Sequence, residues 1–106
     1  MFKINTHPQF TSHVEVPLGD DEPQVLTTRF QALPIEEAKV FDTRTPEGTT
    51  GLLKRVVIRF DDLVDDDGEP IAYTEALRDE LLDLGWVRNA LVRKYFLDLA
   101  GARLGN

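Results

Sequence analysis

The acidic side chains between positions 61 and 69 come closest to a site for chemistry. They are Asp61, Asp62, Asp65, Asp66, Asp67 and Glu69, with Gly68 among them. A calcium loop of the EF-hand type needs oxygen ligands at its positions 1, 3, 5 and 12 and a glycine at position 6. With Gly68 as the sixth residue, Asp65 and Asp67 fit, but Leu63 and Thr74 stand where the first and last ligands belong. We therefore interpret the cluster as a solvated turn and expect no metal site.

The two histidines and the single serine do not form a catalytic pattern either. His7 and His13 are six residues apart and lie in or beside a predicted strand, without helical metal-ligand spacing. Ser12 and His13 are adjacent, and neighbours on a strand point to opposite faces, so they cannot form a nucleophile–base pair by themselves. We expect no catalytic residues, and hence no enzyme.

The glycines and basic residues predict neither a cofactor nor a nucleic-acid partner. Gly48 and Gly51 lack the Lys-Ser/Thr that follows a phosphate-binding loop. The formal net charge is −7, and the sequence pI is about 4.7. Such a surface repels DNA, RNA and anionic lipid, and it suits solubility or a basic protein partner.

Length and composition predict one globular domain spanning residues 1–106. Of the 106 residues, 42% are hydrophobic and 29% charged, and there is no cysteine. The lack of cysteine favours a reducing cytoplasm. No apolar run approaches the length of a membrane span, and Met1–Phe10 does not resemble a signal peptide, so we expect a cytoplasmic protein.

The N-terminal third predicts a β-hairpin. Residues 10–18 and 25–33 are rich in β-formers and nearly alternate, and the Gly/Asp/Pro stretch 19–23 separates them. A lone hairpin is marginal in water, so it must pack on something. The expected fold class is α+β, with the hairpin region 1–33 packed on a helical region 34–106 that contains three to four helices.

The middle of the chain predicts a short helix at 35–41 after Pro34, a connector at 42–48, and a longer helix from about 49 to 64. Apolar residues of the longer helix recur at three- and four-residue steps: Leu53, Val56, Val57, Phe60, Leu63 and Val64. The β-branched run Val56-Val57-Ile58 leaves a strand open as the alternative there.

A tight turn at 65–70, an N-cap at Thr74 and a helix at 75–84 follow, and Gly85 separates this helix from a last one at 86–102. The last helix is apolar on two sides, and we expect it to end at Gly101 and Gly105-Asn106. Such a helix is either central to its own domain or packed on another chain. The candidate protein-binding residues are Trp86, Leu91, Tyr95, Phe96 and Leu99, and the alternative is that they fill the core.

The order of features in residues 50–106 resembles the small tail assembly chaperones of long-tailed bacteriophages and prophages. The resemblance rests on Leu52-Leu53-Lys54-Arg55-Val56-Val57, then on Asp67-Gly68-Glu69-Pro70 leading through Tyr73-Thr74 into a helix, and on Trp86-Val87-Arg88-Asn89-Ala90-Leu91 and Tyr95-Phe96-Leu97-Asp98-Leu99-Ala100-Gly101. Many relatives carry Trp-Xaa-Gly-Val before the acidic turn, where this chain has Phe60-Asp61-Asp62-Leu63-Val64.

The resemblance implies a function without catalysis. Such proteins bind the long, largely helical tape measure protein and keep it soluble while tail tube subunits polymerise round it. They are expected in the host bacterial cytoplasm and not in the finished virion. Self-association into a homo-oligomer and contact with the tail tube protein are further expectations. The alternatives are a structural tail or head-completion protein retained in the virion, and an acidic protein that inhibits a host enzyme.

Overall fold

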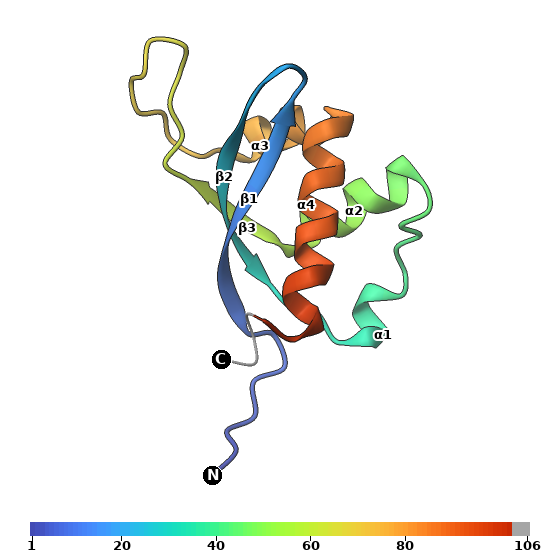
Figure 1. Cartoon of the computed structure of the whole chain (residues 1–106). Coiled ribbons are helices and arrows are strands. Elements are labelled where there is room, and N and C mark those ends of the chain that lie inside the picture. The colour runs from blue at the N-terminus through green and yellow to red at the C-terminus, as the bar shows by residue number, and fades with distance from the viewer. Residues whose placement is uncertain (103–106) are drawn as a thin grey trace.

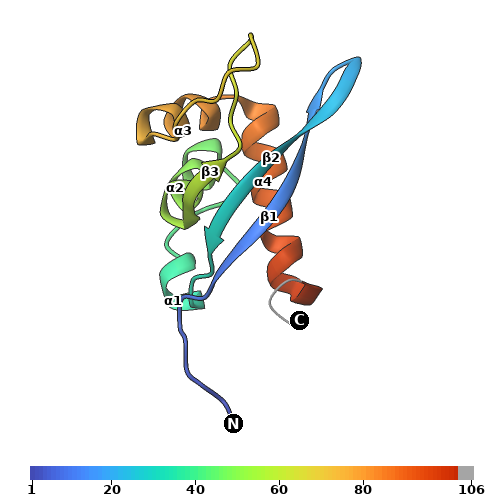
Figure 2. The same cartoon turned by 90° about the vertical axis from the view of Figure 1, so that its left-hand side faces the viewer.

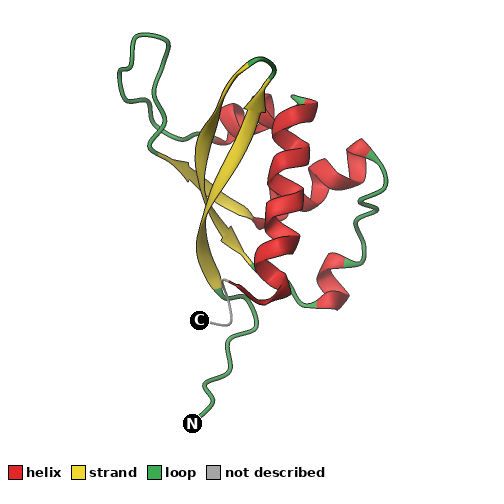
Figure 3. Ribbon diagram, in the orientation of Figure 1, coloured by secondary structure: helices red, strands yellow, loops and turns green. Residues whose placement is uncertain are grey.

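The computed structural model describes residues 1–102 and has the expected α+β architecture (Figures 1 and 3). The strands are β1 (Gln9–Leu18), β2 (Asp21–Gln31) and β3 (Val57–Asp61), and the helices are α1 (Ile35–Ala38), α2 (Pro46–Val56), α3 (Glu75–Leu82) and α4 (Gly85–Leu97), followed by a short π-helical segment η1 (Asp98–Ala102). Helix α4 begins one residue before the predicted start and ends at Leu97, and the helical conformation continues through η1 only as far as Gly101, whose φ of 136° is not helical. Gly105 and Asn106, where an end was also expected, lie outside the described residues.

The strands form one antiparallel sheet in the order β1-β2-β3. The hairpin of β1 and β2 is confirmed, but its connection is shorter than the five residues expected, because β2 already begins at Asp21. Gly19 has a φ of 67°, which allows a tight turn that most residues would strain. The register shifts between Val16 and Leu18, close to Pro17 and Pro23, and prolines in sheets are confined to such irregular or edge positions.

The predicted helix at 49–64 is wrong in its second half. Helix α2 begins earlier, at Pro46, and ends at Val56, and Val57–Asp61 form β3 against the free side of β2. The β-branched residues Val56-Val57-Ile58 favour this change, and β2 offers the backbone partners that a strand needs. The helical region 34–106 therefore contributes one strand to the sheet.

Side-chain caps begin two of the helices. The Thr45 hydroxyl accepts a hydrogen bond from the Gly48 amide at 2.9 Å, and the Thr74 hydroxyl accepts one from the Leu77 amide at 3.0 Å. Each satisfies one of the amides that a helix start leaves without a partner. The cap at Thr74 confirms the predicted start of α3, which ends two residues earlier than expected, at Leu82.

The acidic stretch forms the predicted tight turn. The carboxylate of Asp65 accepts hydrogen bonds from the amides of Asp67 and Glu69, both at 2.9 Å, and the chain closes with a bridge between Val64 and Pro70. Gly68 has a φ of 80°, in the region that favours glycine. The Asp65 carboxylate thus stabilises the turn, and the side chains of Asp66, Asp67 and Glu69 are exposed to solvent.

The core lies between the sheet and the helices, which cover one face of it (Figure 2). The inward side of the hairpin supplies Phe10, Val14, Val16 and Phe30, and the helices supply Leu52, Leu53, Val56, Leu82, Val87, Leu91 and Tyr95, all buried. The rings of Phe10, Phe30 and Tyr95 form a cluster in which centroids are 5.2 to 6.2 Å apart. This cluster fixes α4 against β1 and β2 and so determines which of its faces stays open.

Candidate protein-binding surface

The structure divides the five predicted binding residues into two groups. Trp86 and Phe96 are exposed, at 51% and 46% of their surface. Leu91 and Tyr95 are buried, at 0% and 1%, and Leu99 is partly buried against the core. Leu91 and Tyr95 fill the core, which was the alternative to a role in binding. The prediction that they bind a partner is wrong, because no partner can reach them in this fold.

Helical spacing explains the division. Val87, Leu91 and Tyr95 follow one another at four-residue steps and form the face of α4 that the sheet covers. Trp86, Ala90, Arg93 and Leu97 follow at steps of four, three and four on a neighbouring face. Leu97 is 60% exposed and was not among the predicted residues. Its spacing of eleven residues from Trp86, about three helical turns, is the pattern that places the two on one side.

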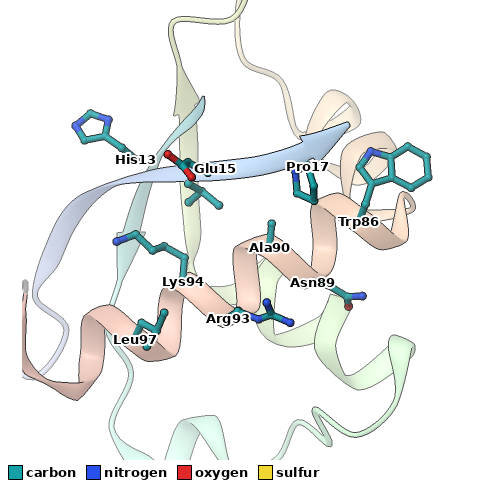
Figure 4. A pocket seen from close by; sticks show the side chains of 10 residues that line it. His13, Glu15, Pro17, Trp86, Asn89, Ala90, Arg93, Lys94 and Leu97 are labelled. Carbon is teal, nitrogen blue, oxygen red and sulfur yellow. The ribbon is translucent and has the colours of Figure 1, made fainter. Parts of the chain in front are cut away.

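This neighbouring face and strand β1 enclose an open groove of about 670 Å³, here called the β1–α4 groove. Figure 4 shows its two sides, with β2 and β3 behind β1. Strand β1 contributes His13, Val14, Glu15 and Pro17, and α4 contributes Trp86, Asn89, Ala90, Arg93, Lys94 and Leu97. Pro17 and Trp86 lie at one end, whereas His13 and Leu97 lie toward the other (Figure 4).

Trp86 stands where three hollows meet. Besides the β1–α4 groove, it lines a hollow of about 540 Å³ beside Pro17 and Leu18. It also lines one of about 450 Å³ whose other side includes Leu63 and Val64. Large aromatic side chains with open space around them are frequent anchors of protein interfaces. Trp86 is therefore the strongest single candidate for contact with a partner.

The charge of the groove differs from that of the whole protein. Helix α4 carries Arg88, Arg93 and Lys94 and no acidic residue, in a chain whose net charge is −7. Lys94 donates to Asp98 at 3.1 Å, and Arg88 donates to the carbonyl of Leu82 at 3.1 Å. Within residues 1–102, Arg93 has neither an ion pair nor a side-chain hydrogen bond, and it is exposed. Glu15 is the one acid that lines the groove in this part of the chain.

Phe96 belongs to another side of α4. Its ring lies against that of Tyr95, with centroids 5.4 Å apart at an interplanar angle of 67°. It does not line the β1–α4 groove. The exposed apolar residues of α4 thus define two separate surfaces, the groove with Trp86 and Leu97, and the surface around Phe96.

Comparison of the chain with protein-family models, with curated proteins and with solved structures finds no match. Among residues 1–102, no helix combines the length and the apolar character that crossing a membrane requires. The same part of the chain contains no group of three or more histidine and acidic side chains placed to hold a metal ion.

Proposed function

We propose that this protein is a tail assembly chaperone of a long-tailed bacteriophage or prophage. It binds the tape measure protein in the host bacterial cytoplasm, keeps it soluble while the tail tube assembles round it, and leaves before the virion is complete. It performs no catalysis and requires no cofactor. The sequence resemblance of residues 50–106 supplies the family, and the exposed apolar residues of α4 supply a surface for the client.

The observation that carries the proposal is the exposure of Trp86 and Leu97 on one face of a helix whose next face is fully buried. An exposed tryptophan beside hollows on a small domain is typical of a surface that binds another protein. The acidic remainder of the chain keeps a complex with an apolar client from associating further.

Coexpression tests this function. The proposed client, the tape measure protein of the phage or prophage that encodes this chain, is produced alone and with it, and the soluble fraction is measured by sedimentation and quantitative blotting. We expect the client to sediment when alone and to remain in solution with the chaperone. The double variant Trp86→Lys, Leu97→Lys should lose most of this effect. Ile35→Lys changes a residue of α1 that is 81% exposed and provides the matched control.

Three outcomes would contradict parts of this proposal. A client that sediments equally with and without this chain contradicts the chaperone function. Mass spectrometry of purified particles that finds this protein in the virion favours the retained structural protein instead. If the double variant protects the client as well as the unsubstituted protein does, the client binds to a surface other than the groove.

Self-association is a second part of the proposal. Phe96 offers exposed aromatic surface apart from the β1–α4 groove. We propose that copies of this chain meet there, which leaves the groove open to the client. Contact with the tail tube protein belongs to the same proposal and follows from the family resemblance alone.

A further inference from the structure

Strand β1 is an edge strand of the sheet. Its only strand partner within residues 1–102 is β2, on one side. In an antiparallel pair, the backbone groups of alternate residues point to the partner, and those of the residues between point away. One backbone hydrogen bond between β1 and β2 is therefore enough to tell which residues of β1 bond to β2 and which have backbone groups that point away from it.

Such a bond is seen at Pro8, next to the start of β1, whose carbonyl accepts a hydrogen bond from the Ala32 amide at 2.8 Å. The register continues from there with Phe10 opposite Phe30, Ser12 opposite Thr28 and Val14 opposite Leu26. The even residues of β1 thus exchange hydrogen bonds with β2. The amides and carbonyls of the odd residues Gln9, Thr11, His13 and Glu15 point to the free edge.

This free edge borders the β1–α4 groove, because His13 and Glu15 line it together with α4 (Figure 4). A strand added to β1 would lie beside it over the face of α4 that carries Trp86, Ala90 and Leu97. Ala90 is small and lies between the larger Trp86 and Leu97, which are toward opposite ends of the groove (Figure 4). Side chains on one side of an added strand would contact this helix face.

The charge of the groove indicates that the added strand carries an acidic residue. Arg93 lies between Ala90 and Leu97 on the same face and, within the described residues, has no carboxylate of its own. A carboxylate on the added strand would form an ion pair with Arg93. The rest of the chain is acidic, so this basic helix face stands out as a place where an acidic segment is attracted and not repelled.

We infer that the β1–α4 groove binds an extended segment of a partner protein, which adds a strand to the free edge of β1 and carries apolar side chains toward α4 and a carboxylate toward Arg93. Backbone hydrogen bonds to an open edge give such binding its affinity, and the pockets beside the strand give its sequence preference. That the segment belongs to the client rests on the proposed function, whereas the binding of such a segment by the groove does not. A client that is helical elsewhere needs only one short extended stretch to bind in this way.

The experiment uses the full chain and a synthetic capped peptide that alternates valine and threonine and carries one central aspartate. Amide hydrogen exchange is measured by NMR with and without the peptide. We expect exchange at Thr11, His13 and Glu15 to slow at least about tenfold near saturation, because these amides gain partners. The amides of Ser12 and Val14 already bond to β2 and should change little. Binding through side chains alone would not produce this alternation and would overturn the inference.

Fluorescence of Trp86, the only tryptophan of the chain, reports affinity. We expect the peptide with lysine in place of aspartate to bind about fivefold more weakly or worse, and Arg93→Glu to reverse the preference. His13→Pro removes one edge amide without breaking a backbone hydrogen bond to β2 and should weaken binding about tenfold, whereas His13→Val, which keeps the amide, should not. Both variants lose the contact of the His13 ring with the Thr27 hydroxyl at 3.3 Å, so His13→Val controls for it. Equal binding of both peptides, or no effect of His13→Pro, would contradict the inference.

Two outcomes separate this inference from its rivals. If the odd amides of β1 are already protected in the free protein and light scattering gives twice the mass of 12.0 kDa, a second copy occupies the edge and the inference fails. If the peptide binds as expected but the tape measure protein still sediments on coexpression, the groove inference holds and the chaperone function fails.

Discussion

Tyr95 and Phe96 are neighbours in the chain and in contact, with ring centroids 5.4 Å apart, but one is core and the other surface. Tyr95 is 1% exposed, lies among Phe10 and Phe30, and donates its hydroxyl to the carbonyl of Gln31 at 3.3 Å. Phe96 is 46% exposed. The pair therefore offers a direct comparison between a residue that holds the fold and one that is available to another chain.

We expect Tyr95→Ala to lower the free energy of unfolding by about 3–5 kcal/mol, because it empties the centre of the aromatic cluster. Phe96→Ala should change it by less than about 1 kcal/mol, since surface substitutions have small effects. Urea unfolding followed by circular dichroism measures both. Losses of equal size would place Phe96 in the core as well.

Phe96→Asp tests the proposed self-association. We expect light scattering to give a lower mass than for the unsubstituted protein, while the helical circular dichroism persists, because a buried contact between copies does not tolerate an unpaired charge. Ile35→Asp, on the exposed start of α1, should leave the mass unchanged. An unchanged mass in Phe96→Asp would show that copies of the chain do not meet at Phe96. Loss of the helical signal would show that Phe96 is needed for the fold of the single chain.

Gly48 and Gly85 both lie in the first turn of a helix, but only Gly48 has no room for a side chain. A Cβ built on Gly48 would overlap the backbone carbonyl of Asp42, whereas at Gly85 the nearest atom is the Arg88 guanidinium at 3.5 Å. We expect Gly48→Ala to destabilise the protein by about 2 kcal/mol or more through displacement of the 42–45 connector. Gly85→Ala should be neutral or stabilising by up to about 1 kcal/mol. Thermal unfolding compares them, and equal effects would show that the connector moves freely.

The helix predicted at 49–64, which is correct up to Val56 and wrong beyond it, shows where sequence patterns become ambiguous. Leu53, Val56, Val57 and Phe60 are all buried, as their spacing predicts. The same residues are buried whether the chain stays helical or changes to a strand after Val56, so the apolar spacing does not distinguish the two. The free side of β2 decides, because it supplies backbone hydrogen bonds to β3 from a segment distant in sequence.

The hairpin, the cap at Thr74, the turn at Asp65 and the break at Gly85 follow from local residue chemistry and are therefore predictable from the sequence. The β1–α4 groove is not, because its two sides come from residues 13–17 and 86–97. Which face of α4 remains open depends on how Phe10, Phe30 and Tyr95 pack together, and a helix apolar on two sides does not reveal this. Only the spacing of Trp86 and Leu97 hinted at a shared face.

The buried hydroxyl of Tyr95 predicts a loss of stability at alkaline pH. Burial raises its pKa above the ordinary value of 10.0. Below the pKa of the unfolded chain, about 10, both states keep the proton and the stability is fully present. Above it, the unfolded chain releases the proton while the folded protein still holds it, so the free energy of unfolding falls as the pH rises through the folded pKa. Burial also raises the pKa of Tyr73, which adds to the loss in the same direction.

Tyr95→Phe isolates this contribution. Near neutral pH the variant should be less stable by about 1 kcal/mol, because it lacks the hydrogen bond to the carbonyl of Gln31. As the pH rises from about 9 to about 11, the unsubstituted protein loses stability through Tyr95 and the variant does not, so the difference between them shrinks. Urea unfolding at several pH values measures it, with Tyr73→Phe as the matched comparison at a less buried ring. A constant difference across this range would mean that the Tyr95 hydroxyl ionises in the folded protein as readily as in the unfolded chain, which its burial against Phe10 and Phe30 argues against.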